Sequence, residues 1–529
     1  MSRRRVLLVG FDATDGDLAL QWMREGRLPT LAALAERGTA VPLNSQGEHM
    51  PESSWASLIT GSSPGEHGIY SWRIVRPGSV QQARMAGGGW TRPFWSVLRD
   101  RLPEPKPRAI VFDIPYSGGM DDDGVIQVSG WGLRVTRQGS SRPAGLFEEL
   151  TATHPGHPSW INRDYDRGPV SERRYRRVLR ELTRRRTRLI LDLFGRSDWD
   201  LAVVNYVEPH FAGHAYHHHI ESAEPPRRRA RWGAPTGLLD LYEEADRNLA
   251  SLIEAAGPEA DVIVVSTIGL RPNETSKDLL TRVMVALGYQ VPAAQAPRSR
   301  TRAAAMRVAT TIVPRFLRHR IRRLVPVGTA EAIADRAWGE SIDWARSRAV
   351  SEAEPGSAWL RLNLEGREPG GIVPPQEREA LLAEITADLE QLIDVETGQP
   401  AVESVISVAD IAAGARVEQM PDALVSWAPR RRIRRVRHPR VGVIDDGGGP
   451  YARTEHNGDG FLVAAGPRFA AGAGPPGDEP REIDVAPTIL HLFGCPVPEQ
   501  MQGEVLDWLL KEERAPVRAE IDLSAEPTF

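Results

Sequence analysis

Residues 201–219, LAVVNYVEPHFAGHAYHHH, decide how the rest of the chain is interpreted. The apolar, partly β-branched run that opens this stretch is typical of a buried strand. Just past it come Glu208, His210 and His214. In an open α/β sheet, ligands bind beyond the carboxyl ends of the strands. Two histidines four residues apart share a face if the chain enters a helix there, so the stretch predicts a metal site. A run of polar loop histidines, which continues through His219, is the alternative.

Strand-like and helix-like segments alternate along the chain. Apolar runs predict strands at 5–11, 40–44, 108–113, 201–206, 261–266, 423–427 and 461–465. Helical patterns occur at 15–25, 29–37, 172–195, 236–256, 375–393 and 482–494. This alternation predicts an α/β fold, a doubly wound, mostly parallel sheet flanked by helices. The Gly- and Pro-rich region 114–170 has weak periodicity and is predicted to form surface loops.

The length of 529 residues exceeds one ordinary domain. We predict a core in two parts, 1–288 and 346–529, with a loop and helix insert at about 114–200 in the first part. Residues 289–345 are basic and rich in Ala and Pro. Because they break the alternating pattern, they are predicted to form a cap or insertion.

The formal net charge is -4, which argues against a general nucleic-acid binder. Arginines nonetheless cluster at 172–188, 298–323 and 429–440. Such runs are either solvated helix faces or a cationic rim that attracts an anionic substrate. The single cysteine, Cys495, excludes an internal disulfide and a cysteine-based zinc site. Nothing in the sequence predicts the oligomeric state.

The N-terminus, MSRRRVLLVGFDATDG, has a very short apolar run and no cleavage-type segment. No stretch approaches the roughly 18 apolar residues that a membrane-spanning helix needs. We therefore expect a cytoplasmic protein without a transmembrane segment. Residues 305–327 mix apolar residues and arginines, so they either contact an anionic membrane surface or form a cap helix packed on the core.

Several segments, in order, resemble the type I phosphodiesterase/nucleotide pyrophosphatase branch of the alkaline phosphatase superfamily. They are RRRVLLVGFDATDGDLALQWMREGRLPTLAALAERG, SWASLITGSSPGEHGIYSW, ADVIVVSTIGLRPN, HNGDGFLVAAGP and DVAPTILHLFGCPVPEQMQGEVL. The resemblance implies an alkaline-phosphatase-like fold. It also implies two metal ions, usually zinc, beside a Thr or Ser nucleophile.

The residues that hold the first ion in this family are mostly absent. Asp12 matches the family's first-strand aspartate, a metal ligand. The nucleophile position falls on Pro51, and the Asp-His pair falls on Thr267 and Ile268. An isoleucine cannot coordinate a metal, and a neutral threonine replaces a carboxylate poorly. The resemblance therefore predicts that this ion is no longer bound.

The ligand positions of the second ion fall on His210, His214 and His456. Three imidazoles with an open fourth position form a catalytic zinc arrangement, and such a zinc lowers the pKa of bound water to about 7. We therefore predict one zinc ion. Glu208 could orient a histidine or act as a general base, and Asp12 could do either as well.

Local replacements for the nucleophile are available near Pro51. Ser53 and Ser54 lie close to the aligned position, and either could act if the loop shifts. The alternative is that one of them caps the following helix. His49 lies in the same loop and is a further catalytic candidate.

These residues predict a divergent, metal-dependent hydrolase or transferase that acts on a small anionic phospho- or sulfo-ester. It would use one zinc ion and no covalent threonine intermediate. The alternative is a metal-poor pseudoenzyme, or a repurposed binding protein, that retains the fold. The sequence does not identify the substrate.

Overall fold

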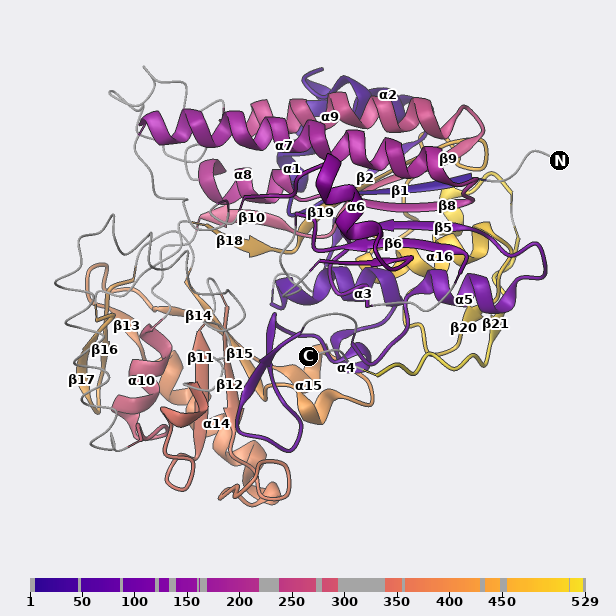
Figure 1. The fold of residues 1–529 in the computed structure, drawn as a ribbon. Coiled ribbons are helices and arrows are strands. Elements are labelled where there is room, and N and C mark those ends of the chain that lie inside the picture. Colours follow the sequence, from indigo (N-terminus) through magenta and orange to yellow (C-terminus); the bar gives the residue numbers. More distant parts are fainter. Residues whose placement is uncertain are drawn as a thin grey trace.

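The computed structural model of the chain contains an eight-stranded sheet and a smaller second unit (Figure 1). Most of the predicted cap, 294–337, lies outside the described residues, and so does the whole candidate membrane-surface segment, 305–327. No helix in the described part is long and apolar enough to cross a membrane. The structure describes residues 5–45, 49–85, 89–118, 123–132, 139–158, 161, 169–217, 237–272, 278–293, 338–353, 357–428, 433–447, 454–512 and 514–526.

The large sheet is mostly parallel, as the sequence predicts. Its strands are, in spatial order, β2 (Thr39–Asn44), β19 (Asp459–Ala465), β9 (Ala260–Ser266), β1 (Arg5–Phe11), β8 (Leu201–Tyr206), β5 (Ala109–Phe112), β6 (Val125–Ser129) and β7 (Ser140–Arg142). The five strands from β9 to β6 run parallel to one another. Strand β19 is antiparallel to both its neighbours, and β7 is antiparallel to β6.

Alternate residues of the central strand β1 feed two hydrophobic cores, because successive side chains of a strand point to opposite faces. Leu7 and Val9 pack with the helices of one face, and Val6 and Leu8 pack with those of the other. A strand buried on both faces is apolar throughout, which explains the continuous run of its sequence. The first face carries α1 (Gly16–Arg24), α2 (Pro29–Arg37), α7 (Pro169–Arg196), α8 (Glu208–Tyr216) and α9 (Gly237–Ala256), and the second carries α3 (Ser54–Thr60), α5 (Phe94–Arg101) and α16 (Val485–Leu492) (Figure 1).

The prediction of surface loops over 114–170 is wrong in part. This region supplies the sheet strands β6 and β7 and the helix α6 (Leu146–Thr153). Strand β6 is short and carries a buried polar residue, Gln127, at its centre. The Gln127 amide donates to Ser117 Oγ over 2.9 Å. A satisfied polar group in a five-residue strand removes the apolar run by which a buried strand is predicted.

The second unit has its own hydrophobic core, which includes Leu279 and Ile444. It contains an antiparallel sheet of order β11 (Ala349–Ala353), β12 (Ser357–Leu362), β15 (Ala423–Trp427) and β14 (Val402–Ser407). Around it lie α10 (Leu279–Leu287), α14 (Arg378–Glu390), β13 (Ile393–Asp394), β16 (Arg435–His438) and β17 (Gly442–Asp445). The boundaries predicted at 288 and 346 therefore fall within this unit rather than at its ends.

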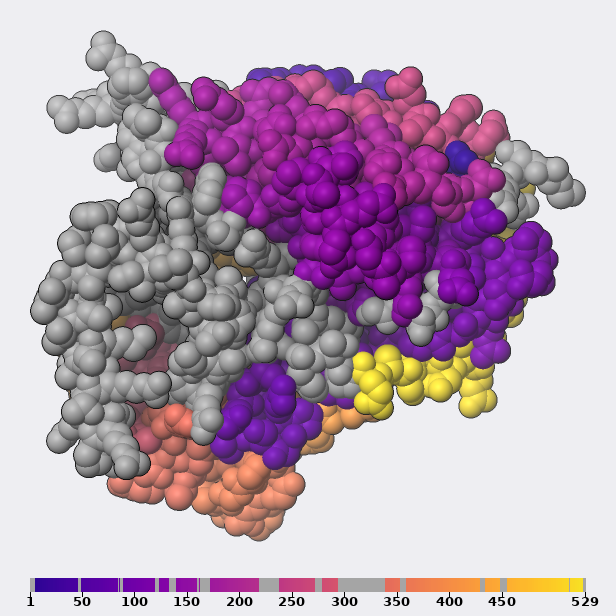
Figure 2. All heavy atoms as spheres, in the orientation of Figure 1, coloured from indigo at the N-terminus to yellow at the C-terminus, as the bar shows by residue number. Residues whose placement is uncertain are grey.

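The arginine-rich segment 172–188 forms part of α7, which packs along α9 at the molecular surface (Figure 2). Arg176 pairs with Asp240 of α9 over 2.9 Å. Glu244 of α9 accepts from the Nε atoms of Arg180 and Arg184, over 2.9 and 2.7 Å. Several of these arginines therefore join two helices, a role that neither interpretation of the sequence included.

We predict that Glu244→Gln lowers the stability at neutral pH by about 1 kcal/mol or more, because a buried acceptor loses charge-assisted hydrogen bonds. The loss is observed as a lower melting temperature. Burial raises the pKa of Glu244, but hydrogen bonds from Arg184, Arg247 and Arg180 outweigh it and hold the pKa at about 2. A lowered folded-state pKa contributes stability above the ordinary value of 4.5 and loses it as the pH falls toward 2.

The measurement is a series of thermal melts of both proteins between pH 7 and pH 3. The difference in melting temperature should shrink below pH 4.5, which is the ordinary pKa of this carboxyl group. Glu243→Gln is the matched control, because its ion pair with Arg27 is more exposed. A difference in melting temperature that stays constant with pH would contradict a stabilising role for the ion pairs between Glu244 and the arginines of α7.

Candidate metal centre

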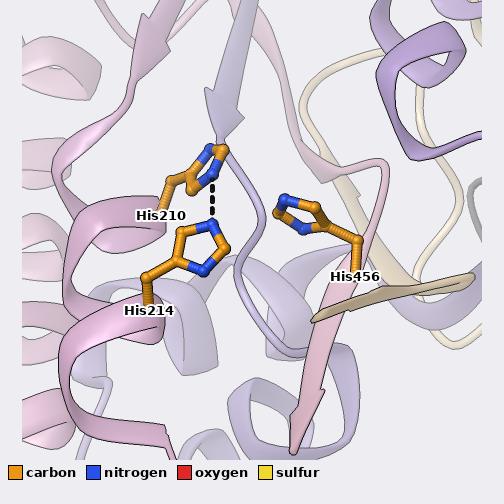
Figure 3. A group of neighbouring side chains, drawn as sticks. All are labelled: His210, His214 and His456. Atoms are coloured by element: carbon orange, nitrogen blue, oxygen red, sulfur yellow. Dashed lines mark hydrogen bonds between the residues drawn. The ribbon is translucent and has the colours of Figure 1, made fainter. Parts of the chain in front are cut away.

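Three histidines from two distant segments meet beyond the carboxyl ends of the parallel strands. His210 and His214 stand one turn apart on α8, and His456 comes from β18 (Thr454–Asn457), which pairs with β10 (Gly269–Pro272). Their ring centroids lie 4.8 to 5.0 Å apart. One nitrogen of each ring lies within 4.8 Å of one nitrogen of the other two. The rings face a common point (Figure 3), so the predicted convergence of this histidine trio holds in the fold.

Each ring of the trio is held through its Nδ1 atom. His210 Nδ1 bonds Asp12 Oδ2 over 2.9 Å, and His214 Nδ1 bonds Thr454 Oγ1 over 2.9 Å. His456 Nδ1 faces the carbonyl oxygen of Gly269 at 3.4 Å. When the Nδ1 atom of a histidine donates to an oxygen, its Nε2 atom is left with a lone pair for a metal.

The Nε2 atoms of the two histidines on α8 lie close to each other. His210 Nε2 and His214 Nε2 are 3.0 Å apart. When both Nδ1 atoms of the neutral rings are protonated, neither Nε2 atom carries a proton and two lone pairs oppose each other. When Thr454 instead donates its hydroxyl proton to His214 Nδ1, His214 Nε2 carries a proton and donates it to His210 Nε2. A shared proton or a metal ion relieves that repulsion. The donor set of the trio therefore fits a metal ion.

The surroundings shift the pKa values of His210 and His456 in opposite directions. Burial lowers the pKa of His210, but the charge and hydrogen bond of Asp12 outweigh it and leave the pKa raised. Burial, together with the nearby His210, lowers the pKa of His456 to about 3. His456 is therefore neutral at physiological pH, as metal ligation requires.

Asp12 lies at the end of β1 and is 3% exposed. Its Oδ1 atom accepts from Trp55 Nε1 over 2.7 Å, and its Oδ2 atom bonds His210. Burial raises the pKa of Asp12, but His210 and Trp55 lower it overall, so the carboxylate is ionised. The sequence left three roles open for Asp12, namely metal ligand, general base and orientation of a histidine, and the geometry favours orientation of His210.

The residues at the positions that the resemblance assigns to the ligands of a first ion make other contacts. Thr267 donates its hydroxyl proton to Ser54 Oγ over 3.0 Å. Ile268 packs in a small buried cluster with Ala13 and Leu270. Neutral and apolar contacts thus replace the ligands that the resemblance places there.

The two candidate serines are buried and bonded to the backbone. Ser53 Oγ donates to the carbonyl of Met50 over 2.6 Å, and Ser54 Oγ donates to that of Pro51 over 3.0 Å. Ser53 occupies the N-cap position of α3, as the capping alternative expects, but no side-chain capping bond is present at the start of the helix. A short 3-10 turn, Pro51–Ser53, precedes α3 instead. His49 lies half-buried just before this turn.

Glu208 begins α8 but points away from the trio. Both oxygens accept from Arg186 Nε, over 2.9 and 3.0 Å, and Oε1 lies 2.7 Å from His157 Nε2. Burial raises the pKa of Glu208, but Arg186 and His157 lower it overall. A fully bonded carboxylate with a lowered pKa is a weak base, so these contacts favour an orienting role for Glu208.

Arg186 was missed at the sequence level, although a signal existed. Within a basic run, it alone falls on the buried stripe of α7, which also contains Leu179, Leu182, Leu189 and Leu193. A charged residue at an apolar position of a helix indicates a buried pair. His157, Trp55 and Thr454 carried no comparable signal, since their partners are distant in sequence.

An α/β fold with imidazoles gathered at the carboxyl edge of a parallel sheet is an alkaline-phosphatase-like architecture with a candidate metal centre. The chain belongs to the type I phosphodiesterase/nucleotide pyrophosphatase family, whose model matches residues 6–440. No curated protein matches the sequence.

Among solved structures, phosphonoacetate hydrolase from Sinorhizobium meliloti 1021 in complex with phosphonoformate is similar, at 13% identity. The match covers 92% of this chain and 94% of that chain, with a TM-score of 0.48. Human ectonucleotide pyrophosphatase/phosphodiesterase 5 is similar at 11% identity. The match covers 96% of this chain and 100% of that chain, with a TM-score of 0.49.

We predict that Asp12→Asn weakens zinc binding about 10- to 100-fold while one zinc ion still binds at saturation, because the change loosens the orientation of His210. Zinc titration against a chromogenic chelator measures both quantities. The control is Asp17→Asn, an exposed carboxylate in the first turn of α1, which should leave the affinity unchanged. Loss of all zinc at saturation would instead identify Asp12 as a direct ligand.

Proposed function

We propose that this chain is a mononuclear zinc hydrolase or transferase that acts on a small anionic phospho- or sulfo-ester. Family membership supports a phosphoester-hydrolase-like function. The proposal is carried by one observation, that His210, His214 and His456 each present a ring nitrogen to one point. The Nδ1 atoms are engaged behind them.

The donor set supports zinc over the other common divalent ions. Zinc favours imidazole in a tetrahedral site, whereas Mg²⁺ and Ca²⁺ favour oxygen ligands. Zn–N bonds of about 2.0–2.1 Å place tetrahedral ligand nitrogens about 3.3 Å apart. The 3.0 Å between the Nε2 atoms of His210 and His214 is close to that separation. When bound, zinc supplies Lewis acidity toward an ester oxygen and lowers the pKa of water.

The residues around Asp12 support a single ion. Trp55 occupies one oxygen of this carboxylate, and His210 occupies the other. Ile268 contributes an apolar side chain to the neighbouring cluster. A second cation there would lack the compensating anionic ligands that a buried charge requires.

The same region argues against a covalent serine intermediate. Ser53 is fully buried and Ser54 nearly so, and both hydroxyls donate to backbone carbonyls. A serine nucleophile needs a base that accepts its proton, and these hydroxyl protons are already committed. Attack by water, or by an acceptor alcohol in a transferase, fits better.

The alternative is a binding protein that retains the fold, and it is favoured by the fixed position of Glu208. Its carboxylate is bonded to Arg186 and His157, so it is not available to take a proton from water. In that case the histidine trio would hold zinc without turnover.

We predict one zinc ion per chain in the protein purified with zinc, and hydrolysis of p-nitrophenyl esters of phosphate or sulfate. His214→Ala should abolish zinc retention and lower turnover about 100-fold or more, because two imidazoles no longer define the site. Metal analysis and a chromogenic assay measure the two effects. His154→Ala, which lies outside the trio at the end of α6, is the control.

Three outcomes discriminate between the alternatives. Zinc with turnover that depends on His214 supports the enzyme. Zinc without turnover of any ester supports the binding protein. Turnover that survives His214→Ala, or wild-type protein without zinc, would overturn the mononuclear zinc enzyme.

A further inference from the structure

A buried ionic contact fixes the first turn of the helix that carries two of the three histidines. Glu208 is the first residue of α8, two positions before His210, and its side chain is 0% exposed. The Nε atom of Arg186 donates to both of its oxygens, over 2.9 and 3.0 Å. The Arg186 side chain is also 0% exposed and comes from α7. The contact therefore joins α7 to the start of α8 inside the protein.

Arg186 makes further buried contacts besides the one with Glu208, although its Nη2 atom has no hydrogen-bond partner among the described residues. Its Nη1 atom donates to Asp113 Oδ2 over 2.8 Å and to the carbonyl of Asn205 over 2.9 Å. Its guanidinium lies 5.0 Å from the ring centroid of Trp131 and 5.4 Å from that of Phe112. Asn205 belongs to β8 and Asp113 follows β5. The guanidinium therefore links the start of α8 to two strands of the sheet.

His157 extends this assembly toward the trio. It bonds Glu208 over 2.7 Å, and its ring packs against Phe211 at 5.6 Å between centroids. Phe211 in turn packs against His210 at 5.9 Å. A continuous chain of buried contacts therefore runs from Arg186 to the metal-facing histidine.

The far end of α8 has a second buried contact. His217, the residue at its C-terminal cap, lies 2.8 Å from Asp15 Oδ2 through Nε2. Both ends of the helix are thus fixed by ionisable pairs. Because His456 comes from a separate strand, such fixation decides whether all three rings meet.

We propose that Arg186 is a positioning residue, a proposal that rests on the zinc centre proposed above. Through Glu208, Arg186 fixes the rotation of α8 about its own axis, so that His210 and His214 face the ion. It touches neither the ion nor the substrate. Ion pairs buried in this way contribute little net stability but define one arrangement of the groups around them. Loss of the pair releases the first turn of α8 while His217 still holds the far end, and a small rotation of that turn separates the Nε2 atoms from His456.

The experiment compares Arg186→Met, Arg186→Lys and a control, Arg188→Met, on the full chain below its melting temperature. Arg188 lies on the same helix, is largely exposed and pairs with Glu181. Zinc affinity is measured by competition with a chelator. We expect Arg186→Met to weaken zinc binding 10- to 100-fold, Arg186→Lys less so, and Arg188→Met not at all.

A spectroscopic readout separates positioning from general destabilisation. The visible spectrum of the cobalt(II)-loaded protein reports the geometry of the ligands. Arg186→Met should change the intensity and position of the bands, whereas Arg188→Met should match wild type. A folded Arg186→Met protein with wild-type zinc affinity and cobalt spectrum would overturn the proposal.

Glu208→Gln provides a second test if Arg186→Met does not fold, because it keeps the shape of the side chain and leaves Arg186 paired with Asp113. The same weakening of zinc affinity is expected, and wild-type affinity would overturn the proposal.

A metal-free readout distinguishes this proposal from the proposed function. In the apo protein, the low-field proton resonance of His210 Nδ1–H, bonded to Asp12, should shift in Glu208→Gln but not in Arg188→Met. Wild-type protein that binds no zinc would refute the zinc enzyme alone. An unshifted resonance would refute the positioning role.

Discussion

The hydrogen bond between Asp12 Oδ2 and His210 Nδ1 is the contact on which the site depends. It fixes which nitrogen of His210 is protonated, and so turns the lone pair of Nε2 toward His214 and His456. Trp55 holds the other oxygen of the carboxylate, so Asp12 cannot turn away. In our proposal, this carboxylate at the end of the central strand orients His210 as a metal ligand and does not itself bind the ion.

Because both oxygens of Asp12 are hydrogen-bonded within the protein, the residues around it do not have to include charged metal ligands. The hydrogen bond between Thr267 and Ser54 and the packing of Ile268 are consistent with that inference. In the centre that we propose, this neutral, partly apolar wall disfavours a second cation, because a buried charge without anionic ligands is costly. The three converging imidazoles and the neutral contacts at Thr267 and Ile268 are both consistent with the single zinc ion that we propose.

Much of the architecture followed from local pattern, and less of the site did. The strands at 5–11, 201–206 and 423–427 were predicted with their observed bounds, because each is an apolar run whose polar residue lies only at or next to one end, and each is followed by a polar or proline-containing segment. The histidine pair on α8 followed from its spacing of four. Strand β6 was missed because Gln127 interrupts it, and Arg186 was hidden among surface arginines. Partners such as Thr454, which is 240 residues from His214, cannot be deduced from local sequence.

The most direct test of a single zinc centre is anomalous diffraction at the zinc edge from crystals of the zinc-loaded protein. One peak is expected per chain, bonded to the Nε2 atoms of His210, His214 and His456 at about 2.0–2.1 Å, with Asp12 still bonded to His210 Nδ1. Two peaks, a peak bound directly by Asp12, or no peak between the three rings would contradict a mononuclear centre built on these histidines.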